Sequence, residues 1–334
     1  MTALRVLVVK TTSLGDVIHM LPAISDASRA LPGLELDWLV EESFFAIPAW
    51  HPAVRRVIPI AMRRWRRQWM KVDAWREFAA ARQTLRAQAY DRIIDSQGLL
   101  KSALWVRIAR GLRCGYDRSS ARESIATIFY QRRFAVARDT HAITRNRLLM
   151  AQALDYPVPE DPPDYGCADL AARLQHLQAS LPTLPVRYLV GLHGTSRVDK
   201  EWLAEHWLQL ACGLQRAGMK LVLPAGNAAE RLRAENLARA CEAVQVLPPL
   251  NLDALALVIA SAEAVVGVDT GLMHLAAALG KPGLALYTAT RPALTGVMSD
   301  RKARAKLINC ESAESLRPDA VTAHLLGILR GRAS

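Results

Sequence analysis

The segment LRVLVVKTTSLGDVIHML, residues 4–21, indicates how this chain of 334 residues folds. An apolar run of strand type at residues 4–9 leads into the polar stretch KTTSLGD at residues 10–16, and a helical pattern follows. In an open α/β sheet, ligands bind where the parallel strands end. The segment therefore predicts a first parallel strand, a first helix, and a loop between them that is placed to contact a ligand.

The same alternation of apolar runs and helical patterns continues along the chain. Further strands are predicted at residues 34–40, 56–60, 91–95, 188–193, 220–226, 244–249, 264–269 and 283–288. Helical patterns cover residues 17–31, 74–89 and 100–110, and others begin near Glu205, Ala229, Leu252 and Leu272. Strands that alternate with helices are typical of parallel sheets, so the predicted class is α/β with doubly wound sheets.

Prolines mark a boundary in the middle of this pattern. YPVPEDPPDY at residues 156–165 holds four prolines, and LPTLP at residues 181–185 holds two more. Such stretches interrupt regular structure and separate domains. The prediction is a first domain at residues 1–160, a linker region at 161–185, a second domain at 186–316, and a C-terminal helix at 317–334 that can pack on either domain.

Positive charge is concentrated in the first half. The net charge is +12, and residues 1–160 hold 25 Lys and Arg against 15 Asp and Glu, a net of +10. This imbalance predicts an anionic partner and leaves nucleic acid, an anionic membrane and a phosphorylated substrate open. No apolar run reaches the ~18 residues of a spanning helix, no signal-peptide pattern is present, and the five cysteines lack CxxC spacing. The expected location is the cytoplasm.

Three motifs of the second half place polar groups at predicted strand ends. In VDTGLMHLAAALGKP, residues 268–282, a strand ends at Asp269 and a helix opens whose N-terminal amides favour a diphosphate. HGTSRVDKEW, residues 193–202, offers two hydroxyls and the Lys200 ammonium as a phosphate clamp. PAGNAAE, residues 224–230, brings Glu230 to a place where it can accept hydrogen bonds from ribose hydroxyls. Each motif alone also fits helix capping or a polar loop.

The first half carries a basic motif, RRWRRQWMK, at residues 63–71. Its arginines can bind phosphates and carboxylates or form an exposed basic face, with the tryptophans in the core or at a membrane interface. Lys101 follows another predicted strand, and Arg122 adds a further cation. In KTTSLGD, Gly15 permits a tight turn and Asp16 lies near a helix start, where an isolated aspartate more often caps the helix.

Several absences narrow the chemistry. The single DTG precedes a helix, whereas aspartic proteases need two such motifs in a β-rich chain. GxGxxG is missing, which argues against a dinucleotide oxidoreductase, and no DxD, HExxH, Walker A or zinc-spaced cluster occurs. A reaction that needs neither a metal nor a cofactor is therefore predicted.

Together the segments VVKTTSLGDVIHMLPA, WLVEESFFAIPAWHPAV, RRWRR, DSQGLLKSA, HGTSRVDKEW and VDTGLMHLAAALGKP make the chain resemble the lipopolysaccharide heptosyltransferases over nearly its whole length. The resemblance implies a GT-B fold, two Rossmann-like domains facing a central cleft, with the acceptor on the first and the nucleotide sugar on the second. It implies inverting, metal-independent transfer of heptose from ADP-L-glycero-β-D-manno-heptose, a substrate and not a cofactor, onto Kdo of Kdo-lipid A. It also implies peripheral contact with the anionic cytoplasmic face of the inner membrane.

The resemblance assigns roles to individual residues. The catalytic residues would be Asp16, as the base, and Lys200. The donor site would comprise Thr195, Ser196, Lys200, Glu230, Leu250, Asp269, Thr270, Gly271 and His274. The acceptor site would comprise Thr12, Ser13, Arg63, Arg64, Arg66, Gln97, Lys101 and Arg122. No metal site is expected.

Two other functions stay open at this point. The chain can be a heptosyltransferase II-like enzyme that adds a later core heptose, although WLVEE, IPAWH and RRWRR favour the enzyme that adds the first one. The basic composition, with a pI of about 9.9, also allows a nucleic-acid-binding α/β protein. No recognised nucleic-acid-binding module appears, so nucleic acid is not the expected partner.

Overall fold

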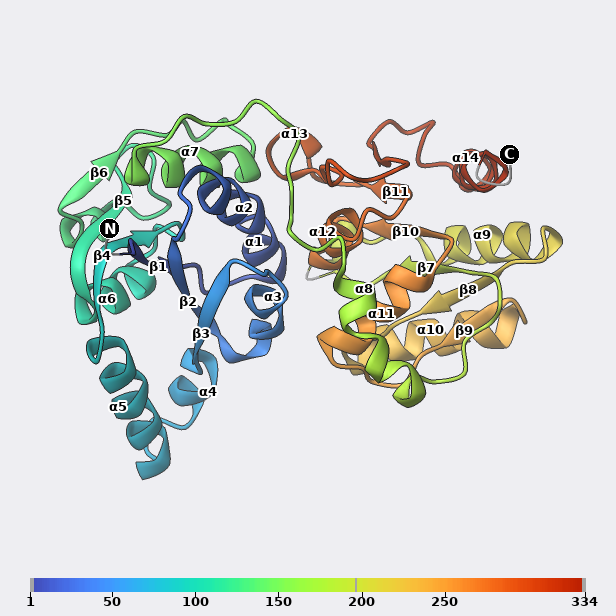
Figure 1. Ribbon diagram of the computed structural model, residues 1–334. Helices are drawn as coiled ribbons and strands as arrows, with labels where there is room; N and C mark the ends of the chain where they lie inside the picture. Colours follow the sequence, from blue (N-terminus) through green and yellow to red (C-terminus); the bar gives the residue numbers. More distant parts are fainter. Residues whose placement is uncertain (1–2, 196, 332–334) are drawn as a thin grey trace. The chain divides into compact units, whose positions relative to one another are not determined.

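The computed structural model describes residues 3–195 and 197–331 and consists of two compact units, Met1–Gly166 and Cys167–Ser334. Each unit holds one six-stranded sheet whose paired strands run parallel (Figure 1). The predicted linker region does not lie outside both units. From Cys167 onward it folds into α8 (Leu170–Arg173) and η3 (Gln175–Ser180), and both contact α11 (Leu252–Ser261) of the second unit.

The first sheet has the strand order β3-β2-β1-β4-β5-β6, the order of the doubly wound nucleotide-binding fold. Its strands are β1 (Arg5–Val9), β2 (Glu35–Glu41), β3 (Val54–Ile60), β4 (Ala89–Asp95), β5 (Arg110–Tyr116) and β6 (Arg132–Phe134). The apolar run of β1 is fully buried from Val6 to Val9 because the strand lies between β2 and β4. This confirms the α/β class predicted from the opening segment.

Helices cover both faces of the first sheet. They are α1 (Leu14–Ile18), α2 (Leu21–Ala30), η1 (Glu42–Phe44), α3 (Ala46–Ala49), α4 (Met62–Arg67), α5 (Val72–Arg86), α6 (Leu100–Ile108), η2 (Ser124–Phe129) and α7 (Ala142–Leu154). Leu7 and Val9 of β1 pack in one cluster with Leu85 of α5 and Trp105 of α6. Successive strand residues point to opposite faces, so Val6 and Val8 face the other side, where α2 and α7 contact each other.

The second sheet repeats the strand order of the first, as β12-β11-β10-β7-β8-β9. Its strands are β7 (Tyr188–Leu192), β8 (Lys220–Leu223), β9 (Val244–Val246), β10 (Ala264–Val268), β11 (Gly283–Leu286) and β12 (Leu307–Cys310). Five of the six strands of this unit were predicted from their apolar runs. The sixth, β12, is buried only at its first and last residues, and its sequence LINC gives no such run.

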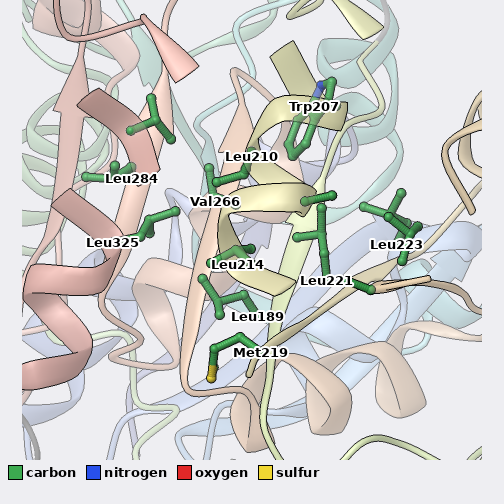
Figure 2. Close-up of a cluster of buried hydrophobic side chains, with 14 of the residues drawn as sticks. Leu189, Trp207, Leu210, Leu214, Met219, Leu221, Leu223, Val266, Leu284 and Leu325 are labelled. Atoms are coloured by element: carbon green, nitrogen blue, oxygen red, sulfur yellow. The ribbon is translucent and has the colours of Figure 1, made fainter. Parts of the chain in front are cut away.

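The core of the second unit lies between its sheet and three helices. The helices of this unit after η3 are η4 (Val198–Lys200), α9 (Ala204–Arg216), α10 (Ala228–Ala240), α11, α12 (Gly271–Ala278), α13 (Pro292–Thr295) and α14 (Pro318–Arg330). The three that pack on the core are α9, α10 and α14. Figure 2 shows Leu210 of α9 beside Val266 of β10, and Trp207 of α9 and Leu325 of α14 belong to the same buried cluster. The C-terminal helix therefore packs on the second unit, which the sequence left undecided.

Candidate functional site

The first polar cluster lies at the switch point of the first sheet, where the loops after β1 and β4 meet. The backbone N–H groups of Thr11 and Thr12 both donate to Oε1 of Gln97, at 3.2 Å each. Lys10 Nζ donates to the carbonyl oxygen of Ser96 at 2.9 Å. Gln97 is buried, and its side-chain oxygen fixes the loop that carries Thr12. This predicted acceptor residue therefore positions its neighbours.

Asp16 lies on the same loop, as the third residue of α1. Its carboxylate accepts hydrogen bonds from the backbone N–H and the hydroxyl of Ser13, at 3.1 and 3.3 Å. Arg122 Nη2 donates to Asp16 Oδ1 at 2.7 Å, so the two predicted site residues form an ion pair. Burial raises the pKa of Asp16, but the positive charges of Lys10 and Arg122 outweigh it and hold that pKa below 3.8. Asp16 is therefore an ionised carboxylate at neutral pH.

Lys10 is a functional candidate that the sequence analysis did not assign to the site. Its ammonium is buried, and this burial lowers its pKa to about 8, although the nearby charge of Asp16 acts in the opposite direction. The signal was available in the sequence, because a lysine directly after a buried strand places its charge at the ligand-binding edge.

A pocket of about 570 Å³ adjoins this loop within the first unit. Thr11, Thr12 and Lys101 are among its polar lining residues, and Lys101 Nζ donates to Thr12 Oγ1 at 3.2 Å. Its walls are mainly aromatic, with Trp65, Trp69, Trp75, Phe78 and Trp105 among the lining residues. Arg63 and Arg66 add cations. The structure thus brings together four of the predicted acceptor residues, Thr12, Arg63, Arg66 and Lys101, around one cavity.

Arg64 lies apart from that group. Its guanidinium donates to Glu42 of η1, at 2.9 and 3.0 Å, and to Glu77 of α5, at 3.0 Å. It does not line the pocket; it faces a neighbouring depression together with both glutamates. In this structure Arg64 joins α4 to η1 and α5, whereas Arg63, one residue earlier, reaches the pocket.

The second polar cluster lies at the switch point of the other sheet, where the loops after β7 and β10 meet. Asp269 Oδ2 accepts hydrogen bonds from Lys200 Nζ and Thr290 Oγ1, each at 2.7 Å. Thr195 Oγ1 donates to the carbonyl oxygen of Asp269 at 3.1 Å. Thr290 was missed by the sequence analysis, although its hydroxyl follows a predicted strand. Of the predicted donor residues, Asp269 therefore contacts both Thr195 and Lys200.

Helix α12 begins directly after this cluster. Thr270 is its N-cap residue and Gly271 its first residue, so the free amides of the first turn lie beside Asp269. These amides and the helix dipole favour an anion there. His274 is buried one turn further along α12. Ser196, also predicted for this site, lies outside the described residues.

Glu230 and Leu250 lie on neighbouring loops of the second unit. The Glu230 carboxylate accepts hydrogen bonds from the backbone N–H of Gly226, at 2.7 Å, and from Asn227 Nδ2, at 2.8 Å. It covers Gly194, where an added Cβ would collide with the carboxylate, and Gly194 adjoins Thr195. Leu250 is half-buried and directly precedes Asn251, the N-cap residue of α11.

Residues 78–323 match the sequence profile of glycosyltransferase family 9 (heptosyltransferase). The chain belongs to this family. It is 51% identical over 297 residues to lipopolysaccharide heptosyltransferase 1 of Pseudomonas aeruginosa, which covers 88% of the chain and 81% of that relative. It superposes on an Escherichia coli heptosyltransferase solved with ADP at a TM-score of 0.85, with 42% identity, covering 99% of the chain and 100% of that structure. The E. coli enzyme solved with ADP-2-deoxy-2-fluoro heptose gives 0.81 and 41%, at the same coverage.

These comparisons confirm the predicted enzyme class and the two-domain α/β architecture of this family 9 glycosyltransferase. Within the described part of the chain, no cluster of three or more His, Cys, Asp or Glu side chains has metal-binding geometry. No described helix combines the length and apolarity needed to cross a bilayer.

Replacing Arg122 with Gln is expected to raise the pKa of Asp16, because the change removes a cation 2.7 Å from its carboxylate. The stability that ionised Asp16 contributes is present above its ordinary pKa of 3.8 and is lost as the pH falls through the lower folded pKa. In the Arg122→Gln variant, this stability is therefore lost at a higher pH than in the wild type. A carboxyl NMR titration, with Asp16→Asn to identify the signal, measures the shift. Arg118→Gln, an exposed change on the same loop, is the control; an unmoved Asp16 titration in Arg122→Gln would refute the effect of the ion pair.

Proposed function

We propose that this family 9 glycosyltransferase moves L-glycero-D-manno-heptose from ADP-L-glycero-β-D-manno-heptose onto Kdo of Kdo-lipid A, the first heptose of the lipopolysaccharide inner core. The observation that carries the proposal is the ionised Asp16 carboxylate, whose loop lines a cation-bearing pocket. A general base at such a place deprotonates the hydroxyl of an anionic acceptor. Similarity to heptosyltransferase 1 and to structures solved with ADP and an ADP-heptose analogue supports the same donor and acceptor.

On the acceptor side, Arg122 has two successive partners. In the structure it pairs with Asp16 and keeps the pKa of this base low, which makes the base weak. A Kdo carboxylate that takes over the Arg122 guanidinium releases Asp16 and raises its pKa toward the working range. Lys101, Arg63 and Arg66 bind the remaining carboxylate and phosphate charges. The acceptor thus activates the base that deprotonates it.

On the donor side, the diphosphate of the nucleotide sugar lies at the first turn of α12. Its charge is neutralised by Lys200 and by the helix amides, so no metal is needed. Thr195 and Thr290 keep Asp269 and Lys200 in place. Glu230, beside Gly194, binds the ribose hydroxyls, and Leu250 contacts the adenine ring.

The transfer inverts the anomeric centre. As the Kdo oxygen attacks the anomeric carbon, its proton passes to Asp16 and the bond between that carbon and the diphosphate oxygen breaks. ADP leaves with the electron pair, and Lys200 stabilises the charge that grows on it. The transition state resembles an oxocarbenium ion, as in glycoside hydrolysis. The acceptor is anchored in lipid, so the enzyme works in peripheral contact with the cytoplasmic face of the inner membrane.

Asp16→Asn is expected to lower turnover by about 100-fold or more, because asparagine cannot take the proton. Its side-chain oxygen can still accept from Ser13, so the unfolding midpoint stays near that of the wild type. ADP release with ADP-heptose and Kdo-lipid A measures turnover, and each substrate alone gives the background. Near-normal turnover in the variant would reduce Asp16 to a residue that stabilises the start of α1.

Lys200→Ala is expected to raise the donor KM and to lower kcat together by roughly tenfold or more, because a charge-assisted hydrogen bond to the leaving group is lost. Lys220→Ala removes an exposed lysine from the start of β8 in the same unit and serves as the control. The same assay in EDTA tests the metal independence. Activity that disappears in EDTA and returns with magnesium would contradict it.

The double change Arg63→Glu with Arg66→Glu is expected to raise the KM for a water-soluble, deacylated acceptor by roughly tenfold or more, while the donor KM stays constant. Arg67→Glu with Lys71→Glu makes the same change in charge on exposed residues that do not line the pocket, and its acceptor KM should stay close to the wild type. If both double variants raised the acceptor KM equally, the cations would act only through the overall electrostatic field of the unit and not through contacts in the pocket.

A further inference from the structure

Large exposed apolar side chains gather on three segments of the first unit. The turn after α4 exposes Met70 by 80% and Trp69 by 64%, and the first turn of α5 exposes Val72 and Trp75 by at least 60% each. Leu100 and Leu104 are exposed on α6, and Ile125 and Ile128 on η2. We call these eight side chains the apolar rim. Contiguous exposed apolar surface on a soluble protein marks a binding surface for a partner or a membrane.

The three segments are neighbours in the fold. Helix α6 contacts both α5 and η2, and α4 contacts α5. In Figure 1, α4 and α5 project together from the end of the first unit. Trp69, Trp75 and Lys101 of these segments also line the aromatic pocket. The apolar rim therefore borders the pocket that holds the proposed acceptor.

The most exposed segment is ordered by its own contacts. The indole N–H of Trp75 donates to the carbonyl oxygen of Trp69 at 2.7 Å, and the Trp75 ring packs edge-on against Phe78. Both indole rings stay more than half exposed, although the Trp75 N–H has a partner. A tryptophan held in this way presents an apolar face, as tryptophans at membrane interfaces do.

Exposed cations lie on the same segments as the apolar rim or directly next to them. They are Arg63, Arg66, Arg67, Lys71 and Lys101. The acidic groups of the same segments are largely engaged. Asp73 pairs with Arg76 at 3.4 Å, Glu77 pairs with Arg64, and Glu123 accepts the backbone N–H of Leu100. Apolar side chains flanked by Lys and Arg are complementary to an anionic bilayer surface, where the apolar groups enter the interface and the cations meet the headgroups.

We propose that the apolar rim inserts into the surface of an anionic lipid bilayer, so that the pocket opens toward the membrane. The inference deepens the proposed function, because it states from which side a lipid-linked acceptor reaches Asp16. The cations next to the rim meet lipid headgroups, while those inside the pocket, Arg63, Arg66 and Lys101, remain for the acceptor. The first unit thus binds the membrane and the acceptor through adjoining surfaces.

A vesicle-binding experiment tests the surface directly. The rim variant carries Met70→Ser, Val72→Ser, Leu104→Gln and Ile128→Asn, four exposed positions that do not line the pocket. The control variant carries Val186→Ser and Leu232→Gln, exposed apolar residues of the second unit. In co-sedimentation with phosphatidylglycerol–phosphatidylcholine vesicles, the rim variant should bind at least about tenfold more weakly than the wild type. The control should bind like the wild type, and phosphatidylcholine vesicles should bind the wild type less.

An activity assay separates this inference from the proposed function. The rim variant should keep its turnover with a deacylated, water-soluble acceptor and show a raised KM for acceptor embedded in vesicles. Equal vesicle binding by the wild type and the rim variant would overturn the inference, and so would a wild-type dimer that the rim changes dissociate. If vesicles bind through the rim but no acceptor is glycosylated, the surface stands and the proposed function fails.

Discussion

The structure depends on one constraint, the reversal of strand order at the switch point of each sheet. β1 lies beside β4 and β7 beside β10, and the loops that follow the two strands of each pair lead to helices on opposite faces of the sheet. The crevice between such loops has backbone groups that need partners. In the first unit, Gln97 fills this need by accepting from two successive backbone N–H groups. In the second, Thr195 donates across the crevice to the Asp269 carbonyl. Both clusters arise because the sheet order leaves polar backbone to be satisfied at this place.

Each switch point also holds a carboxylate paired with a cation. Asp16 pairs with Arg122, and Asp269 with Lys200, each at 2.7 Å. A substrate that brings its own negative charge competes for these cations and therefore changes the state of the carboxylate. In the mechanism proposed above, the two units would use this one electrostatic arrangement for different tasks. The freed carboxylate of the first unit would be the base, and the cation of the second would act on the leaving phosphate.

The sequence predicts the architecture where burial produces an apolar run. β1 and β10 are central strands, and their residues are apolar at nearly every position, so their existence and the loops after them were predicted. β5 has the sequence RGLRCGY, with two arginines and two glycines, and was missed because tertiary pairing with β4 and β6 holds it in the sheet. β6 is only three residues long. The directions of individual side chains also could not be predicted from the sequence. The adjacent arginines of RRWRR point to different places, because Glu42 and Glu77 bind Arg64 while Arg63 lines the pocket. The contact of the Thr290 hydroxyl with Asp269 could not be predicted either, because it forms only when the chain folds.

The packing of α14 has a consequence for the order in which the chain folds during synthesis. Val321, Leu325 and Leu329 of this helix are buried in the same cluster as Leu189 and Leu210, from the start of the second unit. Gly213 of α9 lies so close to Thr322 that an added Cβ would come within 2.6 Å of its methyl group. The second unit therefore cannot complete its core until residue 329 has been made, whereas the first unit has all its strands by residue 134. The growing chain carries a completed first unit followed by a second unit whose apolar sheet is still uncovered, and that sheet is the part that a nascent-chain chaperone would have to cover.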